Sequence, residues 1–197
     1  EDPKQIPPPV STIASGMKPE PPVPWFGPTR GFSFNREVQP VLDRYCVGCH
    51  DGKVTERPNF AAQDENGYMN LPKPYLELNA FVRRNGPEGD LRVVTPAEFH
   101  ADTSELVRML TKGHHNLKLS QEAWDRLITW INLNVPAHGT WCEHAEIVEA
   151  YAWKRREANR KFGGLDYDPE NVSYPVANLG AFQTPEPELE KRPPPKI

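Results

Sequence analysis

The chain has 197 residues, with 27 acidic and 23 basic side chains and a formal net charge of −4 at pH 7. This mild negative charge argues against nucleic acid as a partner, because nucleic-acid-binding surfaces are strongly basic. Hydrophobic residues make up 37% of the chain. The apolar runs are far shorter than the roughly 20 residues that cross a bilayer, so no transmembrane segment is expected.

Proline divides the chain into three parts. Residues 1–30 and 167–197 are rich in proline and poor in apolar side chains, which predicts two extended arms. The part between them predicts one small all-α domain over residues 31–142, followed by an additional helix within 143–166. The chain starts at Glu1 without an initiator methionine or an apolar leader, so a signal peptide is expected to have been removed already.

The first expected helix lies just before residue 46. Spacings of three and four residues give it one apolar face, formed by Val38, Val41, Leu42 and Tyr45. Pro40 falls inside this pattern, and a proline within a helix loses a backbone donor and clashes with the preceding turn. The regular helix is therefore expected either to begin near Gln39 or to be kinked there.

The strongest chemical signal is the Cys-x-x-Cys-His pattern formed by Cys46, Cys49 and His50. Two thiols and an adjacent imidazole at this spacing are typical of covalent haem attachment, in which each sulfur adds to a porphyrin vinyl group and the histidine is the proximal iron ligand. A structural zinc site normally needs a second close pair of Cys or His, and only Cys142 remains. A thioredoxin-like dithiol needs a βαβ pattern, which is not visible around residue 46.

The second expected helix follows the candidate N-caps Asp102 and Thr103, carries a capping-box acid at Glu105, and is closed by Gly113. The third begins at the capping residue Ser120 and should end near Asn134. Its predicted buried stripe is formed by Trp124, Leu127, Ile128 and Ile131.

A fourth helix is expected from Glu143 to Phe162. This segment is rich in Ala, Glu, Lys and Arg, and Gly163 with Gly164 stops it.

A second axial iron ligand is expected in the loop between the second and third helices, which holds His114 and His115. Adjacent residues of one loop cannot both reach the iron, so the spacing leaves the choice between them open. Met69 and Met109 are the competing thioether ligands. Met109 shares a helix face with leucines and is interpreted as a core residue, and Met69 lies in a loop rich in Asn and Gly.

The remaining histidines and the third cysteine have simpler interpretations. His100 is expected to pack or to form a hydrogen bond near a helix start, and His138 and His144 are expected at the surface. Cys142 is interpreted as a buried or partly shielded thiol, with an intermolecular disulfide or a metal site with His138 or His144 as alternatives.

Three stretches of the sequence resemble a family of single-haem cytochrome c domains. They run from Phe34 to His50, from Phe99 to His115 and from Trp124 to Asn134. The family includes the C-terminal haem domain of the hydrazine synthase alpha subunit. The resemblance covers about residues 32–142, with a fainter match around 168–170. It implies a bis-histidine haem with His50 proximal and the histidine of the Gly-His-His motif distal, preferably His114. It does not imply hydrazine synthesis, because only an electron-carrying domain is matched.

The sequence therefore predicts an all-α, single-haem c-type cytochrome that transfers single electrons as a subunit of a larger redox assembly, rather than an enzyme by itself. The expected cofactor is one covalent haem c, held by Cys46, Cys49, His50 and His114, with His115 as the alternative ligand. The expected location is the periplasmic or extracellular side of the membrane. The arms are expected to contact other redox subunits, such as a membrane-bound electron-transfer complex. Two alternatives stay open: a five-coordinate haem in an enzyme or gas sensor, and a scaffold subunit with a structural haem.

Overall fold

The computed structural model of the protein describes residues 13–19, 25–27, 30–64, 67–82, 95–145, 149–164, 166 and 179. All regular elements in these ranges are helical and no strand is present in them, which confirms the predicted all-α class for this part of the chain. The α-helices are α1 (Gln39–Tyr45), α2 (Lys73–Asn79), α3 (Glu105–Lys112), α4 (Gln121–Asn132), α5 (Trp141–Ala145) and α6 (Glu149–Ala158). None of the described helices is long and apolar enough to cross a membrane.

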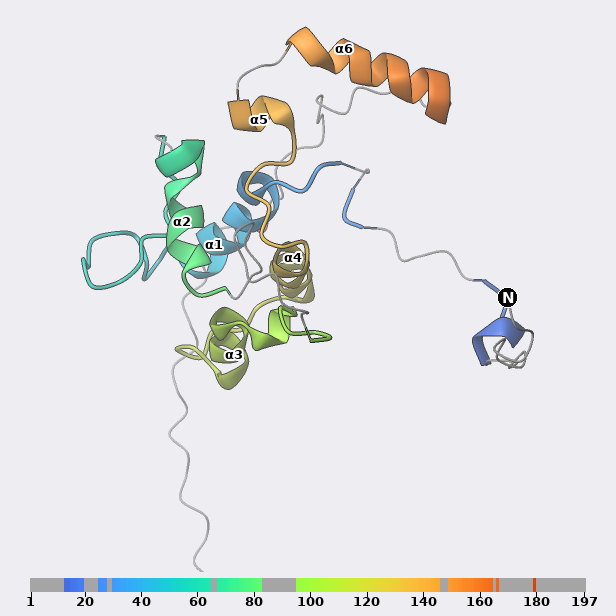
Figure 1. The fold of residues 1–197 in the computed structure, drawn as a ribbon. Helices are drawn as coiled ribbons and strands as arrows, with labels where there is room; N and C mark the ends of the chain where they lie inside the picture. Colours follow the sequence, from blue (N-terminus) through green and yellow to red (C-terminus); the bar gives the residue numbers. More distant parts are fainter. Residues whose placement is uncertain are drawn as a thin grey trace, which may run out of the picture.

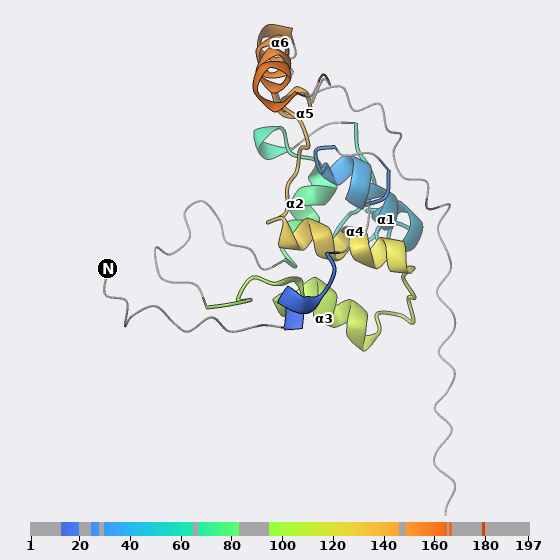
Figure 2. The ribbon, with the colours of Figure 1, turned by 90° about the vertical axis from the view of Figure 1, so that its right-hand side faces the viewer.

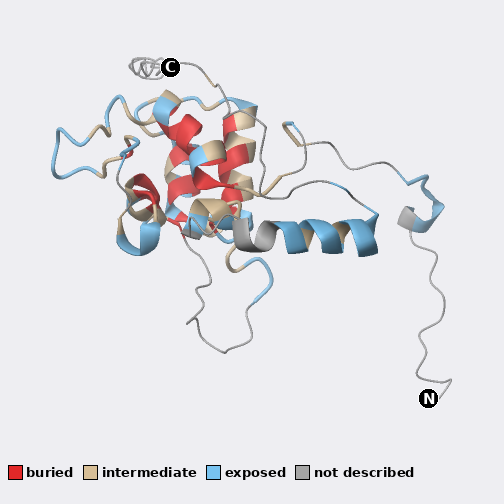
Figure 3. Ribbon diagram, turned by 90° about the horizontal axis from the view of Figure 1, so that it is seen from above, coloured by how far each residue is buried: buried red, intermediate tan, exposed pale blue. Residues whose placement is uncertain are grey.

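Helices α1 to α4 gather into one body, and α5 and α6 lie beyond it (Figures 1 and 2). The buried residues are concentrated where these four helices meet, whereas the described side chains of α6 are mostly exposed (Figure 3). Short turns complete the described elements: 3-10 turns at Ile13–Gly16, Tyr68–Asn70 and Ala101–Thr103, and π turns at Phe34–Val38 and Asn159–Gly163.

Helix α1 begins at Gln39, as the position of Pro40 predicted, with that proline in the first turn, where its missing N–H costs nothing. A π turn precedes it over Phe34–Val38. The predicted apolar face is confirmed, because Val38, Val41, Leu42 and Tyr45 are all buried. The Gln39 side chain donates through Nε2 to the Phe60 carbonyl at 2.9 Å, which ties the start of α1 to the chain beyond the Cys-x-x-Cys-His segment.

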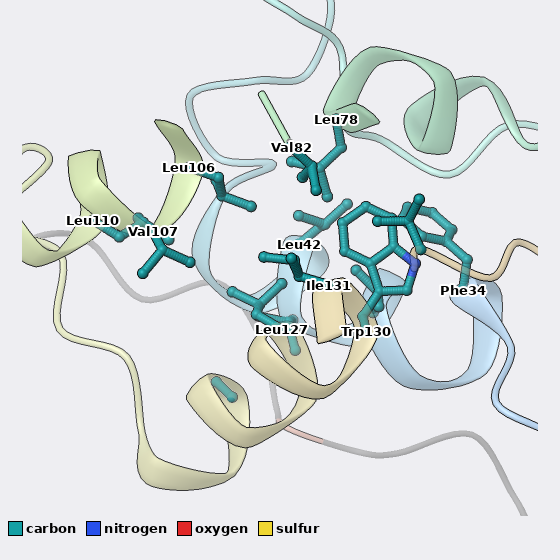
Figure 4. Close-up of a cluster of buried hydrophobic side chains, with 14 of the residues drawn as sticks. Phe34, Leu42, Leu78, Val82, Leu106, Val107, Leu110, Leu127, Trp130 and Ile131 are labelled. Carbon is teal, nitrogen blue, oxygen red and sulfur yellow. The ribbon is translucent and has the colours of Figure 1, made fainter. Parts of the chain in front are cut away.

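Three aromatic side chains form the centre of the core (Figure 4). The Phe34 ring packs edge-on against Tyr75 with 5.4 Å between centroids, and in a tilted arrangement against Trp130 with 5.5 Å between centroids. The polar groups of Tyr75 and Trp130 both have hydrogen-bond partners. The Tyr75 hydroxyl donates to the Val135 carbonyl at 3.0 Å, and the Trp130 indole N–H donates to the Pro136 carbonyl at 3.1 Å. These contacts hold α2, α4 and the turn before α1 together.

Helix α2 is not expected from the sequence. Pro72 and Pro74 flank Lys73 at its start, and proline suggests extended chain unless it occupies the first turn of a helix. The helix is stabilised by burying Tyr75 and Leu78 in the core.

The start of α3 differs from the prediction. Asp102 and Thr103 lie in the preceding 3-10 turn, and the N-cap is Ser104, whose side chain forms no capping hydrogen bond. Its hydroxyl instead donates to the Ala101 carbonyl at 2.5 Å. Because the predicted capping residues belong to this turn, α3 begins only at Glu105. It ends before Gly113, as expected.

Helix α4 begins after Ser120, whose hydroxyl accepts the Ala123 N–H at 3.3 Å, so the predicted cap is confirmed. Its buried stripe is centred on Leu127, Trp130 and Ile131, and also includes Ala123 and Arg126. Of the predicted stripe, Trp124 and Ile128 are only half-buried and border the core. The sequence analysis did not predict that Trp130 and Arg126 are buried. A buried arginine needs charged partners, and only the fold brings such partners beside Arg126.

The predicted fourth helix is present as two described pieces, α5 and α6, separated by residues 146–148, which lie outside the described ranges. Gly164 ends the second piece in a left-handed conformation, as expected. The predicted C-terminal arm also lies outside the described residues except for Leu179, which packs against the core. In the predicted N-terminal arm, residues 13–16 form a 3-10 turn rather than extended chain.

A buried ion network joins the chain entering the domain to α4. Glu37 accepts from Arg30 Nε at 2.7 Å and from the Arg126 guanidinium, and Arg126 also contacts Glu122 at 2.7 Å. The side chains of Glu37 and Arg126 are each only 1% exposed. Charges withdrawn this far from water are tolerated because each has an opposite partner.

Replacing Arg126 should therefore destabilise the domain strongly. We expect Arg126→Met to lower the free energy of unfolding by about 3–5 kcal/mol, because it leaves Glu37 buried with an incomplete set of partners. Denaturant titration of the purified protein measures this. Arg156→Met is the matched control: Arg156 pairs with Asp166 at 3.0 Å, but both side chains are more than half exposed, so the loss should stay below about 1 kcal/mol. Equal losses for the two variants would contradict this account of the core.

Candidate cofactor-binding pocket

An apolar pocket opens between α1, the end of α2, α3 and the start of α4. The cavity itself measures about 190 Å³, and about 940 Å³ of non-atom space is present when the solvent at its open mouth is included. Its walls carry almost no polar atoms apart from thiols and imidazoles. The sequence-predicted residues that line it are Cys46, Cys49, His50, His114, His115 and Met109.

The two cysteines lie on one turn at the end of α1. Cys46 caps the helix, with its N–H donating to the Leu42 carbonyl at 2.8 Å. The N–H groups of Cys49 and His50 then donate to the Cys46 carbonyl at 3.1 and 3.0 Å. This tight turn brings both sulfurs and the imidazole to the wall of one pocket, as covalent haem attachment requires.

The thiols differ in environment. Cys46 is half-buried and its sulfur is withdrawn from water, and this burial raises the pKa of the Cys46 thiol to about 12, with further contributions from Cys49 and Asp43. Cys49 is exposed at the pocket mouth. The Cys46 thiol is therefore protonated and unreactive toward solvent reagents at neutral pH.

The His50 ring is held in one orientation by the chain that follows it. Its Nδ1 lies 3.1 Å from the Pro58 carbonyl, and the Phe60 N–H donates to the His50 carbonyl at 2.8 Å. A carbonyl accepts only, so Nδ1 carries the proton and Nε2 keeps its lone pair. A backbone carbonyl behind the imidazole is the usual outer partner of a metal-bound histidine.

His114 reaches the pocket from the loop after α3. Gly113, with a φ of 96°, turns the chain out of the helix in a conformation that other residues adopt rarely. Burial lowers the pKa of His114, with additional repulsion from His115 and His50. The imidazole is therefore kept neutral at pH 7, which is the form that binds metal ions.

The rings of His50 and His114 lie 6.1 Å apart between centroids, with 29° between their planes. An imidazole nitrogen lies about 2 Å from a bound metal and about 1 Å from its own ring centroid, so two imidazoles on opposite sides of one ion have centroids about 6 Å apart. The distance between these two rings fits an ion between them.

His115 has a different environment. It adopts a φ of 49°, is exposed, and packs edge-on against His114 with 4.6 Å between centroids. The imidazole that lies opposite the His50 ring is that of His114. The geometry thus favours His114 over His115 as the partner of His50.

The other predicted candidates lie as follows. Met109 is half-buried, packs against the core and borders the pocket. Met69 is 65% exposed and is not part of the pocket lining. His100 is exposed and pairs through Nδ1 with Asp102 at 2.9 Å, in keeping with its predicted hydrogen-bonding role.

Cys142 is half-buried as a thiol. The described residues contain no group of three or more His, Cys, Asp or Glu side chains placed to hold a metal ion. Cys142, His138 and His144 therefore do not form a three-ligand metal site in this part of the chain.

Sequence reasoning missed two features of the pocket. The Pro58 carbonyl that orients His50 is a backbone group, which no side-chain pattern can reveal. Phe60 packs on the His50 ring at 4.9 Å between centroids. In the sequence, Phe60 is marked only by being an aromatic residue ten positions after His50.

Compared with known proteins, the chain matches no family model, no curated protein and no solved structure. The chemical interpretation of the pocket therefore depends on its own residues.

The two cysteines should differ in reactivity in polypeptide that carries no group on its sulfurs. Thiolate is the reactive form. With a pKa of about 12 for Cys46, only about one thiol in 10,000 is ionised at pH 8. Iodoacetamide at pH 8 should therefore alkylate Cys49 well before Cys46, and alkylation of Cys46 should accelerate about tenfold per pH unit above that. Peptide mass mapping over a time course measures both rates, and equal rates at pH 8 would contradict the burial of Cys46.

Proposed function

We propose that the protein is a single-haem c-type cytochrome that carries single electrons within a larger redox assembly. The observation that carries the proposal is the 6.1 Å separation of the His50 and His114 rings across an apolar pocket that Cys46 and Cys49 also line. The resemblance of residues 32–142 to single-haem cytochrome c domains supports the same function.

In this proposal each residue has one role. Cys46 and Cys49 would hold the porphyrin through thioether bonds, and His50 and His114 would be the two protein ligands of its iron. When bound, the haem supplies a one-electron couple of iron. The chain's own contribution is to orient both imidazoles, exclude water with leucine and phenylalanine side chains, and thereby tune the reduction potential.

Two imidazole ligands leave no open iron position for a substrate, which favours outer-sphere electron transfer over an enzyme or a gas sensor. The neutral form of His114, favoured by its burial, agrees with ligation. Covalent attachment implies maturation on the outer side of the cytoplasmic membrane, so we infer a periplasmic or extracellular location. The proline-rich segments 1–30 and 167–197 are proposed to contact the other subunits of the assembly.

The experiment that tests the proposal is mass spectrometry of the mature protein together with its absorption spectrum. We expect one porphyrin mass on the peptide that contains Cys46 and Cys49, and a low-spin six-coordinate spectrum. Cyanide should not readily change this spectrum in the ferric state, and carbon monoxide should not readily change it in the ferrous state. Absence of the added mass would refute the haem. A high-spin spectrum that shifts on adding either ligand would instead support a five-coordinate enzyme or sensor.

The ligand assignment has its own test in a pair of neighbouring variants. His114→Ala should convert most of the ferric haem from low-spin to high-spin, because it removes the sixth ligand, and added imidazole should restore the low-spin spectrum. His115→Ala is the matched control and should stay low-spin, because His115 is exposed and packs only on the edge of His114. The opposite pattern, with His115→Ala high-spin, would show that the distal ligand is His115.

A further inference from the structure

A second pair of histidines meets away from the haem pocket. His138 follows α4 and His144 lies on α5, and their ring centroids are 5.3 Å apart with 53° between the ring planes. Both line a hollow whose other walls include Leu71, Thr140 and Trp141. Neither histidine has a role in the proposed electron transfer.

The His138 ring has a nitrogen that is available to a ligand. Its Nε2 is buried and has no hydrogen-bond partner among the described residues. The Asn70 backbone acts to raise the pKa of His138, and the Asn70 side chain donates to the His144 carbonyl at 2.7 Å. A buried polar atom normally has a partner, and a bound ion would supply one for Nε2.

The spacing of the two rings fits a shared ion. With metal–nitrogen distances of about 2 Å and a tetrahedral angle, two imidazoles have ring centroids about 5 Å apart. The His138–His144 separation of 5.3 Å matches this value, whereas the 6.1 Å of the haem pocket matches imidazoles on opposite sides of an ion.

The charges around the pair are balanced. Burial lowers the pKa of His138, and the neighbouring His144 acts in the same direction. The Glu143 carboxylate acts in the opposite direction and brings a negative charge near His138. Glu143 also pairs with Arg36 at 3.8 Å, and Arg155 lies on the wall of the hollow.

We propose that His138 and His144 bind one divalent transition-metal ion such as Zn²⁺, with water in the remaining coordination positions. Imidazole nitrogen is a preferred ligand of such ions, and buried polar groups normally have a partner. The described residues offer no third His, Cys, Asp or Glu ligand to close the site. The site therefore resembles an open metal centre more than a closed structural one.

Calorimetric titration of the mature protein with ZnCl₂, after a chelator has removed loosely bound divalent ions, tests the proposal. We expect one Zn²⁺ per chain, with affinity weakened at least about tenfold in His138→Gln and in His144→Gln. His100→Gln is the matched control for an exposed histidine outside the pair and should bind Zn²⁺ like the parent protein. Unchanged absorption and thermal unfolding would show that the variants are folded.

X-ray absorption at the zinc edge supplies a second measurement. Two imidazole nitrogens at about 2 Å, with water oxygens completing the shell, are expected. Absence of stoichiometric binding, binding that survives both substitutions, or a shell with fewer than two imidazoles would overturn the proposal. The haem proposal would be unaffected by each of these outcomes, because mass spectrometry and the haem spectrum test it separately.

Discussion

The fold depends on an apolar pocket that its own side chains do not fill. Leucines from α1, α3 and α4 converge on this space, and His50 and His114 face each other across it. A protein interior is normally packed as densely as an organic crystal, so unfilled apolar space of this size costs stability. A flat aromatic ligand held between the imidazoles would complete the core. A cofactor bound in this pocket would therefore be a structural part of the domain.

The ion network around Glu37 joins the chain before α1 to helix α4. Trp25 and Phe26 cover the Arg126 guanidinium at 5.9 and 5.1 Å from their ring centroids. Arg126 is adjacent in sequence to Leu127, which lines the pocket. The segment that contains Trp25 and Phe26 therefore packs on the residue next to Leu127, which forms part of one pocket wall. Paired buried charges are sensitive to geometry, so this side of α4 has little freedom to shift.

Local patterns in the sequence predicted the elements that carry their own signals. The start of α1 followed from Pro40, the start of α4 from Ser120, and the end of α3 from Gly113. The cysteine pair and the histidines of the pocket were also identified, because thiol and imidazole spacing is itself chemical information. These features depend on contacts within a few residues, which a single sequence displays directly.

Features that depend on distant contacts were not predicted. Helix α2 carries two prolines at its start and is stabilised by burying Tyr75 and Leu78. From the sequence alone Arg126 is expected at the surface, because its buried partner Glu37 is 89 positions away in the chain. The choice between His114 and His115 was open from spacing, and the ring contact with His50 favours the first. Asn70, which donates to the His144 carbonyl, has no sequence signal at all.

The chain that enters the unit of helices α1 to α4 meets the chain that leaves it at a pair of glycines. A Cβ atom on Gly31 would lie 1.8 Å from the Gly139 carbonyl oxygen, and the Phe34 N–H donates to the Ala137 carbonyl at 3.0 Å. The chain therefore enters and leaves the domain at one point. Domains whose ends adjoin can be inserted into a surface loop of another protein without stretching either chain. The same geometry makes this unit a portable module, one that evolution or an engineer could place inside a larger redox enzyme without rebuilding its core.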